Sequence, residues 1–171
     1  MPQYGLSGVY SQMKHYNKLI LGIFIVLTIM IITSCSSVVN YQNSIFQDEN
    51  KIVENVDSYT YRSRIGKSRG NKYDVKFASF SGMDTIYKIK SDGENDVVFA
   101  FESVIEDGEF KVVLITPDDE IINLVNGTKE GNERIKIKEG VNRIKLVGKK
   151  AKGEIKLKID SGEDIAIKRV D

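Results

Sequence analysis

The sequence predicts an all-β protein whose main domain is an antiparallel β-sandwich, of the jelly-roll or immunoglobulin-like kind, after an N-terminal helix and a polar tether. Three observations carry this prediction. Apolar residues recur at every second position through the last third of the chain, as at Ile135 and Ile137 or Ile155 and Leu157. Gly-containing breaks separate these runs at the spacing typical of sandwiches. No helical period of useful length occurs after residue 57.

The N-terminal apolar run is too short for an ordinary membrane span. Residues 19–32 read LILGIFIVLTIMII, which is 14 residues without a charge, and Lys14 and Lys18 precede them. A basic region followed by an apolar core of about 7–15 residues is typical of a secretory signal, whereas a spanning helix needs roughly 20 residues. We predict a signal peptide over residues 1–34, with Met13 as an alternative start. A short membrane-spanning helix is the alternative.

The end of this run carries the most specific motif. Ile32-Thr33-Ser34-Cys35 resembles the bacterial lipobox, with an aliphatic residue, two small residues and then Cys. The resemblance implies cleavage before Cys35 and transfer of diacylglycerol to its thiol. Two acyl chains anchor a protein stably, because each buried CH₂ contributes about 0.8 kcal/mol. The expected partner is membrane lipid, and the expected location is the extracytoplasmic face of the cell membrane. A buried free thiol is the alternative.

Composition limits the chemistry of the mature chain. If the chain begins at Cys35, its single His (His15) is lost and one Cys remains. Ser-His-Asp and Cys-His catalysis and His-ligated zinc are then excluded. We therefore predict no enzyme activity, no catalytic residue, no metal and no cofactor. The net charge of +1 gives no reason to expect nucleic acid. A carboxylate-pair enzyme and a calcium site formed by two acidic loops (92–96 and 118–120) stay open as alternatives.

The mature chain divides into a polar tether over residues 35–57 and a β-domain over residues 58–171. We expect one short helical turn in the tether, around Phe46–Val53, and about eight or nine strands in the domain. A basic Gly-containing turn is expected over Arg62–Lys72, Pro117-Asp118 is expected in a turn, and Asn126-Gly127 is expected in a β-hairpin. The runs that predict strands lie, in order, around residues 59–61, 73–77, 85–90, 97–101, 110–115, 121–125, 135–137, 144–146, 155–159 and 165–167.

Charge is unevenly distributed. Residues 35–131 carry 11 basic and 17 acidic side chains, whereas residues 132–171 carry 12 basic and 7 acidic. In the C-terminal strands the cations alternate with apolar residues, so neighbouring strands would place them on one face. This face is the predicted anion-binding site, for anionic lipid head groups or wall polymer. A solvated face that resists edge aggregation is the alternative. The six candidate residues are Lys136, Lys138, Arg143, Lys145, Lys156 and Lys158.

A family resemblance supports the same picture. The stretch 73–159, about half of the chain, resembles small lipoproteins of low-GC Gram-positive bacteria. The motifs are Ser81-Gly82, the apolar run Val97–Phe101, the segment 108–112 (GEFKV), Pro117-Asp118 and the segment 150–153 (KAKG). The resemblance implies a β-sandwich and brings no active site with it.

The expected function is that of a lipid-anchored cell-envelope protein with a binding or structural domain. Carbohydrate or wall-polymer recognition is the alternative. Trp, the usual platform for sugar stacking, is absent from the sequence. The strand positions of the candidate rings favour packing in the core over exposure to a sugar. These rings are Tyr59, Tyr61, Tyr73 and Tyr87.

Overall fold

The computed structural model describes residues 19–24, 37–162 and 164–170. Cys35 lies outside these ranges, so its lipidation stays a prediction. The chain divides into two compact units, Met1–Val38 and Val39–Asp171. Residues 19–24 of the first unit are helical. Among the described helices, none combines the length and apolarity that a membrane crossing requires.

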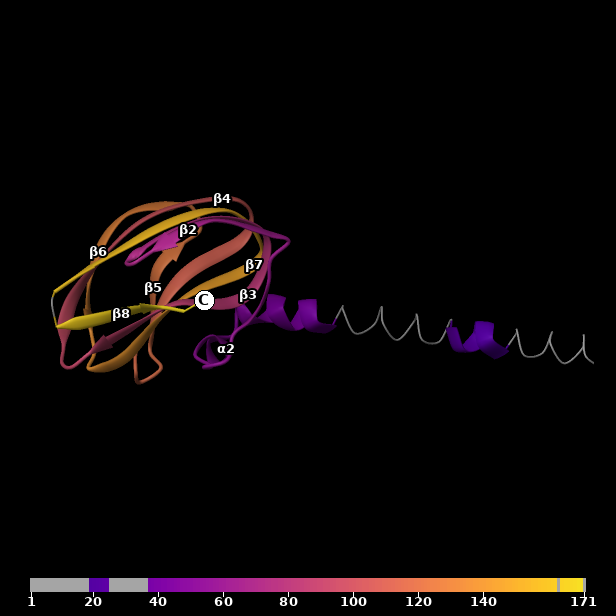
Figure 1. Ribbon diagram of the computed structural model, residues 1–171, viewed down its shortest axis with the longest axis horizontal. Helices are drawn as coiled ribbons and strands as arrows, with labels where there is room; N and C mark the ends of the chain where they lie inside the picture. The colour runs from indigo at the N-terminus through magenta and orange to yellow at the C-terminus, as the bar shows by residue number, and fades with distance from the viewer. Residues whose placement is uncertain (1–18, 25–36, 163, 171) are drawn as a thin grey trace, which may run out of the picture. The chain divides into compact units, whose positions relative to one another are not determined.

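The second unit holds one antiparallel sheet, which confirms the predicted fold class (Figure 1). The strand order is β1-β3-β7-β4-β5, while β2 and β8 also pair with β3, and β6 also pairs with β4. The elements are α2 (Glu49–Ile52), β1 (Ser58–Thr60), β2 (Ser63–Arg69), β3 (Lys72–Ser91), β4 (Asn95–Ile115), β5 (Ile121–Asn126), β6 (Lys129–Ile137), β7 (Gly140–Ser161) and β8 (Ile165–Arg169).

Three long strands fold this sheet over itself. β3, β4 and β7 have 20, 21 and 22 residues, several times the length of an ordinary strand. Each contains a positive-φ residue at its bend: Gly82 (φ 103°) in β3, Gly108 (φ 74°) in β4 and Lys150 (φ 55°) in β7. The pairing registers shift at residues 77–82 and 105–109, as expected where bulges bend strands.

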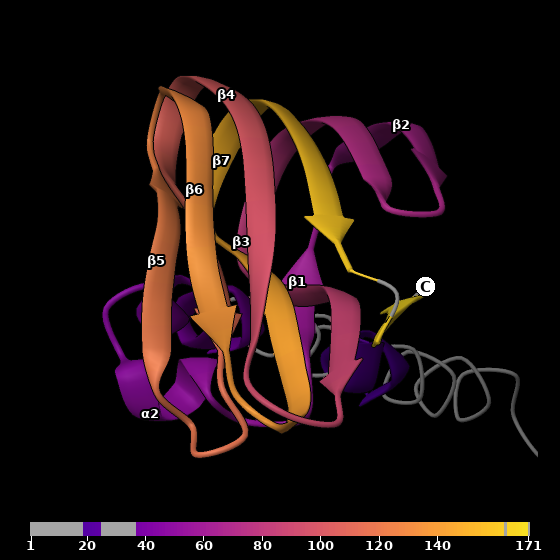
Figure 2. The same cartoon turned by 90° about the vertical axis from the view of Figure 1, so that its left-hand side faces the viewer.

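The bends divide the sheet into two layers (Figure 2). Layer 1 comprises β2, β6 and residues 72–77 of β3, 95–105 of β4 and 153–161 of β7. Layer 2 comprises β1, β5, β8 and residues 80–91 of β3, 109–115 of β4 and 140–151 of β7. The aromatic rings of Phe77 and Phe110 stack across the layers with centroids 4.9 Å apart, and Tyr73 meets Tyr87 at 6.4 Å.

The main hydrophobic core lies between the layers, as a sandwich requires. Alternate residues of β3, β4 and β7 supply most of it, so the period-two pattern of the sequence is confirmed. Phe80, Val112, Leu114, Ile144 and Leu146 are among its members from layer 2.

Several of the Gly-containing segments between the predicted strand runs are bends within strands. Ser81-Gly82 lies inside β3 and Gly148 to Gly153 lies inside β7. The predicted basic turn over Arg62–Lys72 is mostly strand β2, and only the residues between Arg69 and Lys72 form the turn. The hairpin predicted at Asn126-Gly127 is wrong, because β5 and β6 each pair with β4, and the bend at residues 127–128 connects the two layers.

Residues 39–57, which we call the covering segment, differ from the predicted tether. Ile45 and Ile52 have no exposed surface, and Phe46 is 8% exposed. They pack on the outer face of layer 2 against a second apolar cluster that includes Met83, Val113, Ile115 and Val147. The apolar residues of the covering segment occur singly or in adjacent pairs, such as Ile45-Phe46 and Ile52-Val53, between polar stretches, so the sequence shows no sustained period. The expected helical turn is present as α2, which Asp48 caps through its side chain.

Candidate functional site

The six predicted cations do not share one face. Arg143 and Lys145 lie on the outer face of layer 2, and Lys136 and Lys138 lie near the loops at one end. Lys156 and Lys158 lie together on the outer face of layer 1, and strand alternation places Lys136 of β6 on the same face. The alternation of cations with apolar residues was predicted correctly. The common exposed face was wrong, because the alternate face of layer 2 is covered by residues 39–57.

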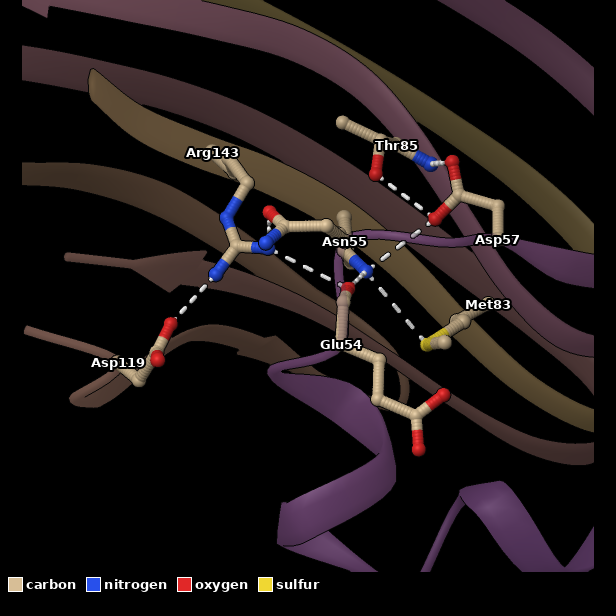
Figure 3. Close-up of polar contacts among 8 residues, drawn as sticks. Glu54, Asn55, Asp57, Met83, Thr85, Asp119 and Arg143 are labelled. Atoms are coloured by element: carbon tan, nitrogen blue, oxygen red, sulfur yellow. Dashed lines mark hydrogen bonds and ion pairs between the residues drawn. The ribbon is translucent and has the colours of Figure 1, made fainter. Parts of the chain in front are cut away.

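Arg143 and Lys145 are buried and hold the covering segment in place. Figure 3 shows the contacts of Arg143 with Asn55 and Asp119. The guanidinium of Arg143 donates to the side-chain oxygen of Asn55 at 2.6 Å and to Asp119 at 2.7 Å. The amine of Lys145 donates to the backbone carbonyl of Glu54 and pairs with Asp57 at 3.2 Å. These two residues are therefore structural and are removed from the predicted anion-binding set.

The same cluster fixes Asp57. Its carboxylate accepts hydrogen bonds from the backbone N–H of Thr85 at 3.0 Å and from the Thr85 hydroxyl at 2.8 Å. Burial lowers the pKa of the Lys145 amine from its ordinary value, while the nearby Asp57 charge opposes this shift. The hydrogen bonds of this cluster replace those that its polar groups lose to water on burial. Because they run between residues 54–57 and strands β3 and β7, they join the covering segment to layer 2.

Lys136 and Lys138 belong to exposed ion pairs. Lys138 lies 2.9 Å from Asp118 and 2.8 Å from Glu120, and these hydrogen bonds raise its pKa. Lys136 lies 3.5 Å from Glu94. The acidic loops proposed as calcium ligands are thus engaged with cations. Within the described residues, no group of three or more potential metal ligands is present.

Lys156 and Lys158 border a groove of about 380 Å³ on the outer face of layer 1. Lys156 lies 3.0 Å from Glu102, and this hydrogen bond raises its pKa. Lys158 lies 2.7 Å from Asp160. Both cations are about half exposed and paired with carboxylates, so the face has mixed charge and is not a basic lattice.

Strand register builds the groove from two rows of side chains. In the first row Lys158 lies between Lys72 and Ala100, and Ala100 pairs in turn with Asn132. The second row contains Asp74, Lys156, Glu102 and Glu130 in the same strand order. Since neighbouring strands are about 4.8 Å apart, four strands span roughly 14 Å. Because Ala100 has the smallest side chain of the two rows, it leaves space between its larger neighbours, and this space forms the groove.

Sequence reasoning identified two of these eight groove residues. The missing information was the pairing of β3, β7, β4 and β6, which brings groove residues of β3 and β6 together although they are at least 56 positions apart in the sequence. The exposed alternation of Asp74, Ala100 and Glu102 is visible in the sequence, but it does not indicate which strands are neighbours.

Three of the four predicted aromatic rings pack as the strand positions indicated, whereas the prediction is wrong for Tyr59, which is 44% exposed. Tyr73 and Tyr87 are buried in the core. Tyr61 stacks on Phe80 with ring centroids 4.4 Å apart and donates its hydroxyl to Asp84 at 2.8 Å. Burial, reinforced by Asp84, raises the pKa of Tyr61, so this hydroxyl stays protonated. Among the groove residues Tyr73 and Phe101 are aromatic, and both rings are buried.

Comparisons with known proteins give no family. No protein family and no curated protein matches the chain. A family 35 carbohydrate-binding module from an environmental isolate aligns over 66% of this chain and 82% of its own, with 15% identity and a TM-score of 0.36. The enzymatically active domain of bacteriophage CBA120 tailspike protein 4 aligns over 71% and 20%, with 7% identity and a TM-score of 0.36. The fold assignment therefore stands on the strand pairing.

Proposed function

We propose that this chain is a non-enzymatic binding domain that takes a carbohydrate chain into the groove of layer 1. The observation that supports the proposal is the groove itself, which is open and lined by amines, carboxylates and an amide from four strands. Sugar hydroxyls both donate and accept hydrogen bonds, so they suit a surface where Lys158, Asn132 and Glu102 alternate donors and acceptors. The near balance of charge favours a neutral polymer over an anionic one.

Binding at this site is expected to be weak. Lys156 and Lys158 must each exchange part of an existing ion pair for a sugar hydroxyl, and no exposed aromatic ring for stacking is among the described residues that line the groove. The gain over water is therefore small for each contact. A polymer would gain affinity by occupying several domains at once on a surface.

Substitution at the floor of the groove tests the proposal. Ala100→Leu fills the groove with an apolar side chain, and we expect it to weaken binding of soluble glycan oligomers at least tenfold in an NMR titration. Ala166→Leu is the matched control, because Ala166 is exposed on β8, outside the groove. Equal affinity of the two variants would contradict the proposal. Recovery of shortened oligomers would contradict the non-enzymatic part.

The anchoring part of the proposal rests on the lipobox resemblance at Cys35. We propose a diacylglyceryl thioether at this residue, which holds the domain at the extracytoplasmic face of the membrane. Metabolic labelling with a fatty acid should mark the wild-type protein and not the Cys35→Ala variant. Unchanged labelling of that variant would reject lipidation at Cys35 and leave the groove proposal untouched.

A further inference from the structure

A basic cleft lies away from the predicted anion face. It has a volume of about 560 Å³ and opens between β2 and the end of β8. Four cations line it, and no carboxylate is among its described lining residues. The cations are Arg64, Lys67, Arg69 and Arg169.

Arg64 is fixed at the inner wall of this cleft. It shares the inward face of β2 with Gly66, since both pair with core-facing residues of β3. Its guanidinium donates to the Tyr73 hydroxyl at 3.0 Å and lies 3.5 Å from Asp84, a buried carboxylate outside the cleft lining. The guanidinium also lies over the Tyr61 ring, 5.4 Å from its centroid. A side chain held by this many contacts loses little entropy when it binds a ligand.

Arg169 closes the opposite wall. It lies on the same side of β8 as Ile165 and Ile167, which pack against the core. One guanidinium nitrogen donates to the backbone carbonyl of Ser68 at 2.6 Å, so β8 and β2 are connected across the mouth. The Ser68 hydroxyl is buried and has no hydrogen-bond partner among the described residues. The cleft thus combines a fixed arginine on each side with an unsatisfied hydroxyl in its wall.

We propose that this cleft binds phosphate groups of an extended phosphodiester chain. Arginine presents a planar set of donors that matches phosphate oxygens, and several cations in one concavity suit repeated negative charges better than a single carboxylate. The concave shape favours a chain over a flat lipid surface. Lys67 and Arg69 complete the cleft, and within the described part of the chain neither has a recorded ion pair. The cleft and the sugar groove share only Tyr73.

The test uses the full chain and a soluble poly(glycerol phosphate) oligomer as the probe. The double variant Lys67→Gln with Arg69→Gln removes two cations without touching the contacts of Arg64 or Arg169. We expect its affinity to fall at least about tenfold, since one charge-assisted hydrogen bond accounts for that much. The matched control is Lys88→Gln with Lys168→Gln, an exposed cross-strand pair that removes the same charge from β3 and β8. It should bind as the wild type does.

Further arms separate the sources of phosphate. Inorganic phosphate should compete with the oligomer, acetate at equal ionic strength should compete less, and binding should weaken as salt increases. The Ala100→Leu variant should keep oligomer affinity, which separates this proposal from the sugar groove. Equal loss in the test and control variants would overturn the proposal. If the protein binds phosphatidylglycerol vesicles and does not bind the oligomer, the ligand of the cleft is a membrane surface, and the proposal of a phosphodiester chain is overturned.

Discussion

The outer face of layer 2 is covered by another part of the chain, whereas the outer face of layer 1 is exposed. The outer face of layer 2 carries Met83, Val113 and Val147 and is covered by residues 39–57. The outer face of layer 1 carries paired charges around an open groove. The same strands, β3, β4 and β7, contribute to both faces, so the difference comes from which residues alternate with the core positions on each side of the bend. Cations of a single strand can therefore have different roles: in β7, Lys145 stabilises the fold, whereas Lys156 and Lys158 border the exposed groove.

The largest expected effect concerns the apolar contacts of the covering segment. Ile52→Ala removes a fully buried side chain, and we expect a loss of about 3–4 kcal/mol in the free energy of unfolding. Val56→Ala is the control, because Val56 is 76% exposed and its truncation should change stability by less than about 0.5 kcal/mol. Urea denaturation measures both. A similar small change for both variants would show that layer 2 is not closed by this segment.

Removal of the buried amine should have the next largest effect. Lys145→Ala removes the cation that pairs with the Asp57 carboxylate and donates to the Glu54 carbonyl, which should cost about 3 kcal/mol. Asp57 keeps its hydrogen bonds from Thr85, but its charge loses the neighbouring amine. Lys145→Met keeps the packing of the aliphatic chain and should recover part of that loss. Equal stability of the wild type and the alanine variant in thermal unfolding would contradict a structural role for Lys145.

The pH dependence of stability sharpens the same point. Burial lowers the pKa of Lys145 in the folded protein below its ordinary value of 10.5. Between the folded-state pKa and 10.5, the unfolded chain still holds a proton that the folded protein has lost. Stability should therefore rise with pH through this window. The Lys145→Met variant lacks this contribution, and subtracting its unfolding free energies from those of the wild type isolates it. A difference that stays constant over the window would contradict the lowered pKa.

The bend between the layers should tolerate little change. A Cβ at Gly82 (φ 103°) would lie 1.9 Å from the Ser58 carbonyl oxygen, so Gly82→Ala must displace β1. We expect a loss of about 2–3 kcal/mol from strain and the lost pairing. Gly70 (φ 58°) has open space around it, so Gly70→Ala should cost only about 1 kcal/mol. Chemical denaturation that ranks these two variants in reverse order would refute the role of Gly82.

The exposed pairs of layer 1 should have the smallest effect on stability. Lys156→Ala breaks a pair in which both side chains are nearly half exposed, and such pairs contribute less than about 0.5 kcal/mol. A loss as large as that of Lys145→Ala would contradict the contrast between the layers. Differential scanning calorimetry at low and moderate salt would measure it.

The sequence predicted the fold class because core positions keep a strict period of two. It did not reveal that Gly82, Gly108 and Lys150 bend continuous strands, since a glycine in a strand and a glycine in a turn look alike in sequence. The sequence predicts exposed side chains for Arg143 and Lys145, because lysine and arginine are rarely buried unless they are paired. Their partners, Asn55 and Asp57, lie near the end of a segment whose composition resembles a tether. Long-range pairing of this kind has no local signal.

The most direct test of the account is a titration of the isotope-labelled protein with a neutral glycan oligomer, followed by amide chemical shifts. We expect shifts confined to the outer-facing groove residues of layer 1, centred on Ala100, Asn132 and Lys158, and absent from the covered face around Lys145. Shifts centred on the covering segment or spread evenly over both layers would contradict the assignment of layer 1 as the binding face.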